Sequence, residues 1–498
     1  PRVQRWKVRS PPFNGIVMDA SNLSIREINS LFTKKELKPS ELYSKVFENA
    51  ANSEAALHAH LTLFEEENIK KAAESDKRFS NGESTSLLDG IPIAIKDNIN
   101  IKNYKTTCSS KMLSNYTSPY DATVIEKLKE QNTLFTGKTN LDEFAMGSST
   151  ENSAFGLTKN PWNTDYVPGG SSGGSAASVG ARSSIAALGS DTGGSIRQPA
   201  SFCGLVGFKP TYGTVSRFGL VAFASSLDQI GPITKTVDDS RIIFSSISGE
   251  DSRDATSVIN NQLDIPSDNT ATIGVIKELM EDGISDEAKN EVNKVVEILK
   301  SKGYKVKEIS IPIIKLSISI YYLIAPAECS ANLARFDGVR YGLRVDGNTS
   351  YEMMENTRAE GFGAEVKRRI LLGTYALSAG YYDEYYGKAL QARKEMIDEF
   401  AKTFKDVDYL ISPTTPTQAF KSGEKTSNPL EMYMSDLCTI PANLAGLPAI
   451  SIPTGLSKDE LPLGVQVMSK PLSDNSLLDF SEIIENEVQF DGQPKGWL

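Results

Sequence analysis

The sequence predicts an α/β protein built as a single large domain, with a mixed, mostly parallel central sheet covered by helices on both faces. From Leu88 to Ile233, short apolar stretches alternate with helical ones, which is typical of βαβ units. Beyond Thr234 the same rhythm continues more loosely. The chain has 498 residues, of which 39% are hydrophobic, enough for a large core, and no linker marks off a second domain.

Residues 1–17 are arginine-rich and differ in character from the rest of the chain, so we interpret them as a non-native or processed extension and assign the domain to residues 18–498. Ser24 and Glu27 form a capping-box pattern that predicts a first helix. Pro39 precedes a second helix. Residues 56–63 alternate like a strand with His58 and His60 on one face. Because no further histidine or cysteine cluster accompanies them, we expect no metal site there.

The remaining elements follow from apolar runs of strand length and from longer amphipathic stretches. The expected strands are 91–95, 133–135, 186–188, 272–276, 305–309, 409–412, 448–453 and 464–468. The expected helices are 64–79, 122–131, 175–181, 285–300, 318–333 and a long helical run at 364–404.

The stretch with the clearest chemical meaning is Gly169–Arg197, in which two glycine–serine clusters flank a small-residue helix. Glycine lets backbone N–H groups approach a ligand closely, so this stretch predicts a site for an anion or an oxyanion. Ser172 satisfies the G-x-S-x-G nucleophile pattern, but that pattern needs a histidine downstream, and both histidines lie upstream. Neither cluster continues into Gly-Lys-Ser/Thr, so a phosphate cradle is disfavoured.

Serine chemistry without histidine needs another base, and lysine is the usual substitute. Lys96 ends the apolar run GIPIAIK, where partial burial would favour the neutral amine. For an arbitrary strand, a solvated strand-end lysine is the commoner outcome.

Three fragments, GIPIAIKDNI, PGGSSGGSAA and GSDTGGSIRQPA, occur in order and at compatible spacing, and together they resemble the amidase signature family. The resemblance implies the amidase signature fold with its core at about residues 86–233. It also implies a catalytic triad of Lys96, Ser171 and Ser195 without a metal, with Ser171 after a cis peptide bond. In that mechanism Ser195 attacks an amide carbonyl, and Ser171 relays its proton to Lys96. The backbone of Thr192, Gly193 and Gly194 would supply the oxyanion hole, together with the Ser195 amide.

The flanking segments, such as residues 137–156, 209–232, 325–342 and 365–386, resemble the branch of this family that forms the glutaminase (A) subunits of tRNA-dependent amidotransferases. That resemblance implies Arg369, or its neighbour Arg368, for the carboxylate of glutamine, and Asp436 for its ammonium. Tyr321 or Tyr322 would lie nearby. Taken without the resemblance, the two arginines fit a solvated helix face and Asp436 fits a helix cap.

The same branch implies partners, namely B and C subunits in a heterotrimer that converts Glu-tRNA(Gln) to Gln-tRNA(Gln). We expect no cofactor in this chain, and ATP and Mg²⁺ in the partner, which would also make most of the tRNA contacts. The net charge of −10 argues against a direct grip on nucleic acid, and no apolar run is long enough for a membrane helix. Four scattered cysteines fit a reducing compartment, so we expect the cytoplasm, or an organelle if residues 1–17 are a targeting segment.

Two other interpretations compete with the glutaminase subunit. One is a stand-alone amidase for other carboxamides, which would have no need of an arginine and an aspartate for the two charged ends of an amino acid. The other is a non-catalytic scaffold or phosphate-binding module, against which the complete set of Lys96, Ser171 and Ser195 argues.

Overall fold

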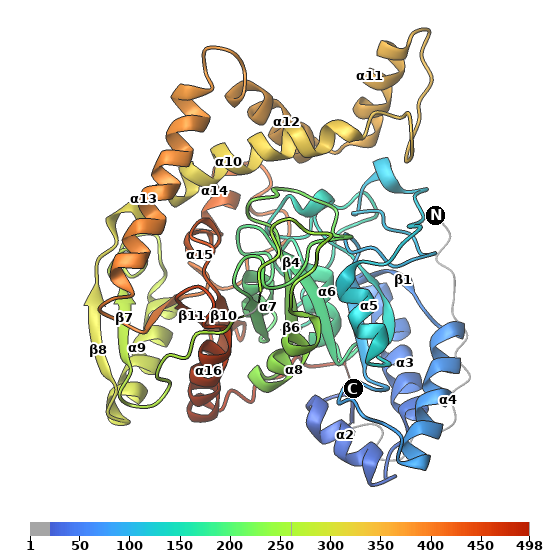
Figure 1. Ribbon diagram of the computed structural model, residues 1–498, viewed down its shortest axis with the longest axis vertical. Coiled ribbons are helices and arrows are strands. Elements are labelled where there is room, and N and C mark those ends of the chain that lie inside the picture. The colour runs from blue at the N-terminus through green and yellow to red at the C-terminus, as the bar shows by residue number, and fades with distance from the viewer. Residues whose placement is uncertain (1–19, 260, 498) are drawn as a thin grey trace.

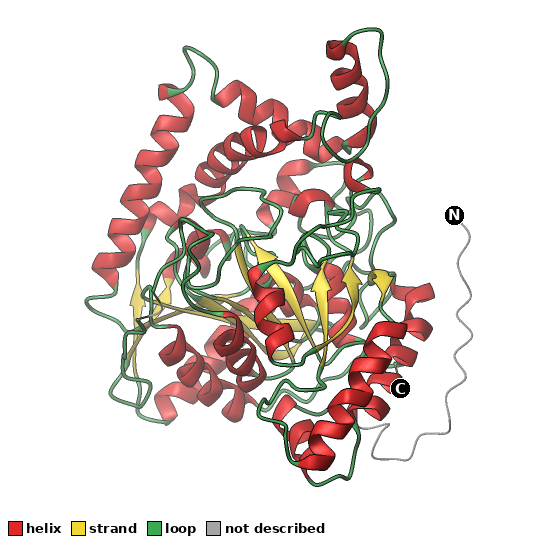
Figure 2. Cartoon of the chain, turned by 45° about the vertical axis from the view of Figure 1, so that its right-hand side comes forward, coloured by secondary structure: helices red, strands yellow, loops and turns green. Residues whose placement is uncertain are grey.

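The computed structural model describes residues 20–259 and 261–497, so the prediction for residues 1–17 lies outside the described residues. An 11-stranded sheet runs through the middle of the described chain (Figures 1 and 2). Its strands lie in the order β1 (His60–Leu63), β3 (Leu134–Thr139), β2 (Pro92–Lys96), β4 (Ala186–Asp191), β6 (Gln229–Thr234), β5 (Val206–Lys209), β10 (Ala449–Leu456), β11 (Pro462–Ser469), β9 (Tyr409–Pro413), β7 (Thr272–Ile276) and β8 (Lys305–Ile309). The prediction of one large α/β domain with a mixed sheet is confirmed.

The balance of strand directions needs a correction, because antiparallel pairs outnumber parallel ones. Four of the ten neighbouring pairs in the described sheet are parallel, namely β2 with β3 and with β4, and β7 with β8 and with β9. The other six are antiparallel. The prediction assumed a crossover helix after every strand. Residues 210–228 instead connect β5 to β6 without a helix, and a short turn joins β10 to β11, and such connections allow antiparallel pairing.

The N-terminal helices α2 (Ile25–Thr33), α3 (Pro39–Leu57) and α4 (Glu66–Asn81) lie beyond the β1 edge of the sheet (Figure 1). The predicted capping box of α2 is present, with Ser24 and Glu27 each accepting from the other's backbone N–H. The strand expected at 56–63 is shorter than predicted. Its first residues continue α3, and His58 is the left-handed C-cap of that helix at φ 52°, so His58 and His60 do not share a strand face.

Two groups of helices contact the same strands from opposite sides (Figure 2). One side carries α8 (Val237–Ile247), α16 (Asp474–Val488), α9 (Asp286–Ser301) and α5 (Thr123–Glu130). The other carries two short helices, α6 (Gly173–Gly180) and α7 (Arg197–Phe202), both wholly buried. Because α6 begins and α7 follows at the two glycine–serine clusters, these clusters are fixed inside the protein.

A further layer lies beyond the carboxyl ends of β2, β3 and β4 and is drawn at the top of Figure 1. It contains α10 (Ser317–Asn332), α11 (Ser350–Gly361), α12 (Ala364–Ala376) and α13 (Lys388–Thr403), with the short helices α14 (Pro429–Met434) and α15 (Ile440–Leu444) beneath. The long helical run predicted at 364–404 is two helices, because Gly380 adopts φ +88° and a π-helical turn at Asp383–Gly387 leads into α13.

One described stretch, Pro312–Arg335, is long and apolar enough by length and composition to cross a membrane. It contains α10, which packs between α12, α13 and α15, and more than half of its most apolar window is buried. Burial in this helical layer accounts for its composition.

Candidate active site

Lys96 is the last residue of β2, between β3 and β4, and its side chain is fully buried. Its ammonium Nζ donates to the hydroxyl oxygens of Ser171 at 2.7 Å, Ser172 at 2.8 Å and Ser190 at 3.0 Å. It also lies 3.2 Å from the Ser190 carbonyl oxygen. The sequence therefore puts one amine at the carboxyl end of a central strand, surrounded by serine oxygens.

The surroundings of Lys96 change its protonation. Burial lowers the pKa of the amine from its ordinary 10.5 to about 7, although the carboxylates of Asp142, Asp191 and Asp228 pull in the opposite direction. A proton acceptor works best when its pKa lies near the pH at which it acts. Lys96 therefore meets the chemical requirement for a general base at neutral pH.

Ser171 follows a cis peptide bond from Gly170. The Gly170 N–H donates to Gln198 at 2.8 Å, and the Ser171 carbonyl accepts from the N–H of Asp142 at 3.3 Å. A side chain at Gly170 would collide with the Asp142 carboxylate at 2.2 Å and with the Ser149 backbone at 2.5 Å, so the close approach requires glycine. The loop that carries Ser171 is thus held on both sides.

Ser195 lies in the second cluster, in the turn between β4 and α7. Its carbonyl accepts from the Ser172 N–H at 3.2 Å, which ties the two glycine–serine clusters together. Ser195 is 8% exposed, whereas Lys96 and Ser171 are fully covered. Within the described residues its hydroxyl makes no hydrogen bond. Of the three predicted triad residues, Ser195 is the one that an incoming substrate can reach.

A buried ion pair shapes the turn that carries Ser195. Arg197 and Asp191 are both fully buried, and the guanidinium meets the carboxylate through two contacts of 3.0 Å. Burial alone would raise the pKa of Asp191, but Arg197 lowers it to about 2. The same carboxylate accepts from the N–H groups of Gly194 at 2.8 Å and Ile196 at 3.2 Å. Asp191 therefore stays charged and fixes the backbone on both sides of Ser195.

These contacts bear on the predicted oxyanion hole. The N–H of Gly194 is engaged by Asp191, so it does not point to a ligand here. The N–H groups of Thr192, Gly193 and Ser195 have no acceptor among the described residues. The geometry favours these three as donors over Gly194.

Arg369 projects from the inner face of α12, and its side chain is 3% exposed, against 45% for Arg368. Its Nε donates to Glu365 at 2.8 Å, and its guanidinium lies 5.2–5.6 Å from the ring centres of Tyr322, Phe223 and Tyr433. The structure thus distinguishes the two arginines, since only Arg369 faces the interior.

Asp436 lies between α14 and α15 and is buried. It accepts from the Ser148 hydroxyl at 2.6 Å. Burial raises the pKa of its carboxyl to about 7, although Ser148 and the charge of Arg369 pull it down. A buried carboxylate with one neutral donor has room for a cation as its partner.

Tyr321 connects this region to the turn that carries Ser195. A side chain at Gly193 would lie 2.8 Å from the Tyr321 ring and 2.9 Å from its hydroxyl, so the ring packs directly on Gly193. From the other side, Thr439 donates to the Gly193 carbonyl at 2.7 Å. Tyr322 instead stacks on Tyr433, 3.7 Å between ring centres.

The sequence interpretation missed several neighbours. Asp191 and Arg197 were readable, because they lie inside the GSDTGGSIR motif and a buried turn that carries a charge needs the opposite charge. No sequence signal identified Glu365, Tyr433 or Thr439, because their contacts join segments far apart in the chain.

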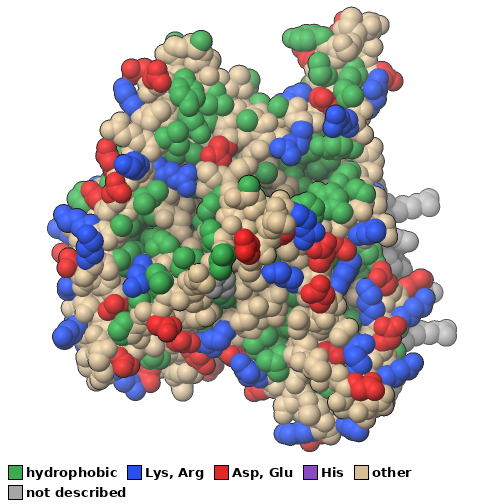
Figure 3. Space-filling model, viewed as in Figure 1, with side chains coloured by type: hydrophobic (Ala, Val, Ile, Leu, Met, Phe, Trp, Pro, Cys, Tyr) green, Lys and Arg blue, Asp and Glu red, His purple; other side chains and the backbone are tan. Residues whose placement is uncertain are grey.

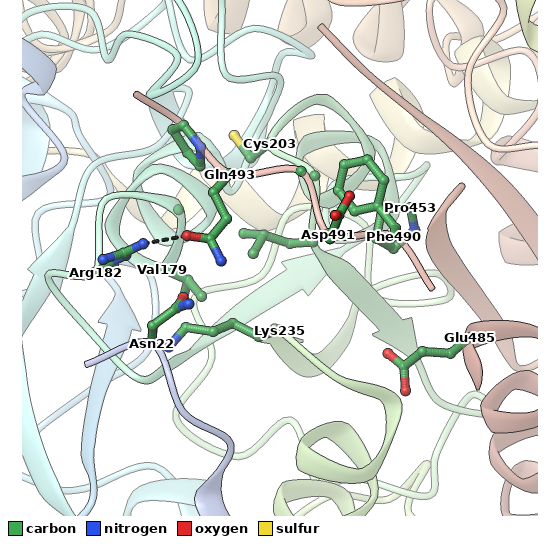
Figure 4. A pocket seen from close by; sticks show the side chains of 15 residues that line it. Asn22, Val179, Arg182, Cys203, Lys235, Pro453, Glu485, Phe490, Asp491 and Gln493 are labelled. Carbon is green, nitrogen blue, oxygen red and sulfur yellow. Dashed lines mark hydrogen bonds between the residues drawn. The ribbon is translucent and has the colours of Figure 1, made fainter. Parts of the chain in front are cut away.

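A separate pocket of about 190 Å³, shown in Figure 4, contains none of these residues. It is lined by the C-terminal segment with Lys235 and Arg182, and Arg182 donates to Gln493 across it. Among residues 20–259 and 261–497, no cluster of three histidine, cysteine or acidic side chains could hold a metal ion.

Comparisons with known proteins agree with this geometry. A family model described as Amidase matches residues 41–478. The chain is 52% identical over 479 residues to the A subunit of glutamyl-tRNA(Gln) amidotransferase from Carboxydothermus hydrogenoformans, covering 95% of this chain and 99% of that protein. It is 50% identical over 478 residues to the protein of the same name from Thermosynechococcus vestitus, covering 94% and 98%. The crystal structure of the corresponding glutamyl-tRNA(Gln) amidotransferase protein from Thermotoga maritima superposes with a TM-score of 0.78 at 44% identity, covering 94% of this chain and 95% of that one.

Proposed function

This chain belongs to the amidase family, and we propose that it is the glutaminase subunit of a tRNA-dependent amidotransferase, which hydrolyses glutamine to supply ammonia. The observation that carries the chemistry is the buried Lys96 amine, 2.7 Å from the Ser171 hydroxyl and with a pKa near neutrality. The amidotransferase assignment is supported by relatives of that name that are about half identical over nearly the whole chain.

The reaction proceeds through an acyl-enzyme. Ser195 attacks the side-chain carboxamide carbon of glutamine, and its proton passes through the Ser171 hydroxyl to the neutral amine of Lys96. The backbone N–H groups of Thr192 and Gly193 donate to the oxygen that becomes negative. Lys96 then returns a proton to the leaving nitrogen, and ammonia departs. Water attacks the resulting ester with the same base, and glutamate is released.

Specificity for glutamine comes from two charged side chains. Arg369 binds the α-carboxylate, because its guanidinium is held in an aromatic setting and is covered from bulk water. Asp436 binds the α-ammonium, which gives that buried carboxylate a charged partner. Tyr321, which packs on Gly193, lies at the boundary between this subsite and the reacting carboxamide.

Ammonia release is one half of the overall reaction. The B and C subunits would bind this chain, and the partner would use ATP and Mg²⁺ to activate Glu-tRNA(Gln) and then amidate it with the ammonia. This division fits the net charge of −10, because a protein that grips tRNA by itself carries basic surface. We expect the complex in the cytoplasm.

The test is to purify the chain alone and with its B and C subunits, then to measure ammonia release from glutamine and formation of Gln-tRNA(Gln). We expect weak or no ammonia release by the lone chain, faster release in the complex, and amidated tRNA in the complex only. If the lone chain amidates Glu-tRNA(Gln), or if the partners leave its ammonia release unchanged, a stand-alone amidase becomes the better assignment.

A further inference from the structure

Helix α12 has two faces of different character. Its buried face is a stripe at helical spacing, Val366, Arg369, Gly373 and Ala376, which packs toward α10 and the candidate active site. On the surface of a protein, the opposite face of such a helix is normally polar. Here that face carries Leu371, which is 71% exposed, with Leu372 and Tyr375 beside it, both nearly half exposed.

The exposed apolar side chains continue beyond the end of α12. The Tyr375 ring contacts the rings of Tyr381 and Tyr385, with ring centres 4.6 and 5.9 Å apart. We call these side chains the α12–α13 apolar face; its members are Leu371, Leu372, Tyr375, Tyr381, Tyr382 and Tyr385, all of them exposed. Figure 3 shows hydrophobic side chains gathered over the upper end of α13.

Contiguous exposed apolar patches on this scale mark binding surfaces, and tyrosine with leucine suits the centre of a protein interface. The charges around the face have both signs, with Arg368 and Lys388 paired to acidic neighbours on the same helical segment. A nucleic acid or an anionic membrane would require an excess of positive charge, whereas a mixed rim suits another protein.

We propose that the α12–α13 apolar face is the docking surface for a partner subunit of the amidotransferase. The occupant is a polypeptide surface with an apolar centre and a rim of both charges. The inference rests on the proposed function, because the relatives are named as one subunit of an amidotransferase, which implies further subunits.

The position of this face adds to the argument. The same helix presents Arg369 toward the site and Leu371 outward, so a docked partner lies about one helix diameter, roughly 10 Å, from the substrate arginine. Helices α12 and α10 pack closely, because a side chain at Gly373 would overlap the Pro326 carbonyl oxygen at 1.9 Å. A partner bound there would lie next to the site that releases ammonia.

The test compares the wild-type chain with the double variant Leu371→Asp, Tyr375→Asp. The matched control is Ile69→Asp on α4, a helix at the opposite end of the molecule whose Ile69 is 46% exposed (Figure 1). Each chain is co-expressed with the B and C subunits, and complex formation is measured by co-elution and by titration. We expect binding at least about tenfold weaker for the double variant and within about twofold of wild type for the control. Wild-type affinity of the double variant would overturn the proposal.

A second measurement does not depend on the variants folding. Hydrogen–deuterium exchange of the wild-type chain, alone and in the complex, should show protection of residues 371–390 in the complex; a complex without that protection contradicts the docking surface. Sedimentation of the lone chain tests the other occupant, because a wild-type dimer that the double variant abolishes would assign the face to a second copy. Ammonia release on the same samples separates the two proposals. A protected but inactive complex contradicts the proposed function, whereas an active complex of normal affinity with the double variant contradicts the docking surface.

Discussion

The ammonium nitrogen of Lys96 lies 2.7 Å from the hydroxyl oxygen of Ser171, and both side chains are fully buried. Lys96 ends a strand and Ser171 lies 75 residues later in a loop, so the contact exists only in the folded sheet. A buried amine in contact with a hydroxyl can accept a proton through it, provided that the amine is neutral. The first predictions concern that pair and the serine next to it.

Replacing Ser195 should remove ammonia release while leaving the fold intact. Ser195→Ala deletes a hydroxyl that makes no hydrogen bond within the described residues, so its structural cost is small. We expect a thermal unfolding midpoint close to that of the wild type and a loss of glutamine hydrolysis of at least about a thousandfold. Covalent labelling by an amide-directed inhibitor should be at Ser195. Labelling of Ser172 would instead assign the nucleophile to the G-x-S-x-G pattern.

The pH dependence of kcat/KM should reflect two groups. The base needs Lys96 neutral, and ammonium binding needs Asp436 ionised. The pKa of Lys96 is lowered to about 7 and that of Asp436 is raised to about 7, so both requirements fail as the pH falls below about 7. Well below that pH, kcat/KM for glutamine should fall about 100-fold per pH unit, and for an uncharged amide about tenfold. Equal slopes for the two substrates would contradict a role for Asp436 in binding.

Lys96 should also make stability depend on pH. Its pKa is about 7 in the folded chain and about 10.5 in the unfolded chain, so between these values the unfolded state holds the extra proton. Stability therefore rises with pH across that window, and the deficit is complete below about pH 7. In Lys96→Met this contribution is absent. The free energy of unfolding of the wild type, minus that of the variant, should rise by about 3 kcal/mol from pH 6 to pH 9. A constant difference would mean that Lys96 is charged throughout.

How far the sequence reaches depends on the distance over which each feature is determined. The capping box of α2 was predictable, since Ser24 and Glu27 are three residues apart. The strand expected at 56–63 was wrong in its first half, because the left-handed cap at His58 overrides the alternating pattern. The balance of parallel and antiparallel pairs was also wrong, because pairing joins distant strands such as β5 and β10.

The candidate site divides in the same way. Lys96, Ser171 and Ser195 lie in recognisable fragments, and the structure brings their three loops together. The choice between Arg368 and Arg369 was open in the sequence, because adjacent helix positions differ in burial only once α12 has packed on α10. Glu365 and Tyr433 carry no sequence signal, since their part in the site depends on contact with Arg369.

Exchanging Asp436 for asparagine should impair glutamine more than other amides. The substitution keeps the shape and a hydrogen bond to Ser148, but it removes the charge that faces the ammonium. Losing one partner of a buried ion pair costs about 2–5 kcal/mol, so KM for glutamine should rise by at least about 30-fold. KM for an uncharged amide should change little. If both KM values rise together, Asp436 acts on the fold of the pocket and not on the ammonium.

The last prediction separates Arg369 from its neighbour. Arg369→Lys keeps the positive charge but loses the planar fork that grips a carboxylate through two parallel hydrogen bonds, and it loses the stacking against Tyr322. KM for glutamine should rise about tenfold to 100-fold, corresponding to roughly 1.5–3 kcal/mol for a charged hydrogen bond. KM for an amide without a carboxylate should stay within about twofold. Arg368→Lys is the matched control, because Arg368 is adjacent in sequence, pairs with the same Glu365 and is half exposed. Steady-state ammonia release with both substrates measures all four combinations. If Arg368→Lys raises KM for glutamine and Arg369→Lys does not, the carboxylate is bound at the outer face of α12, and the substrate orientation proposed here is wrong.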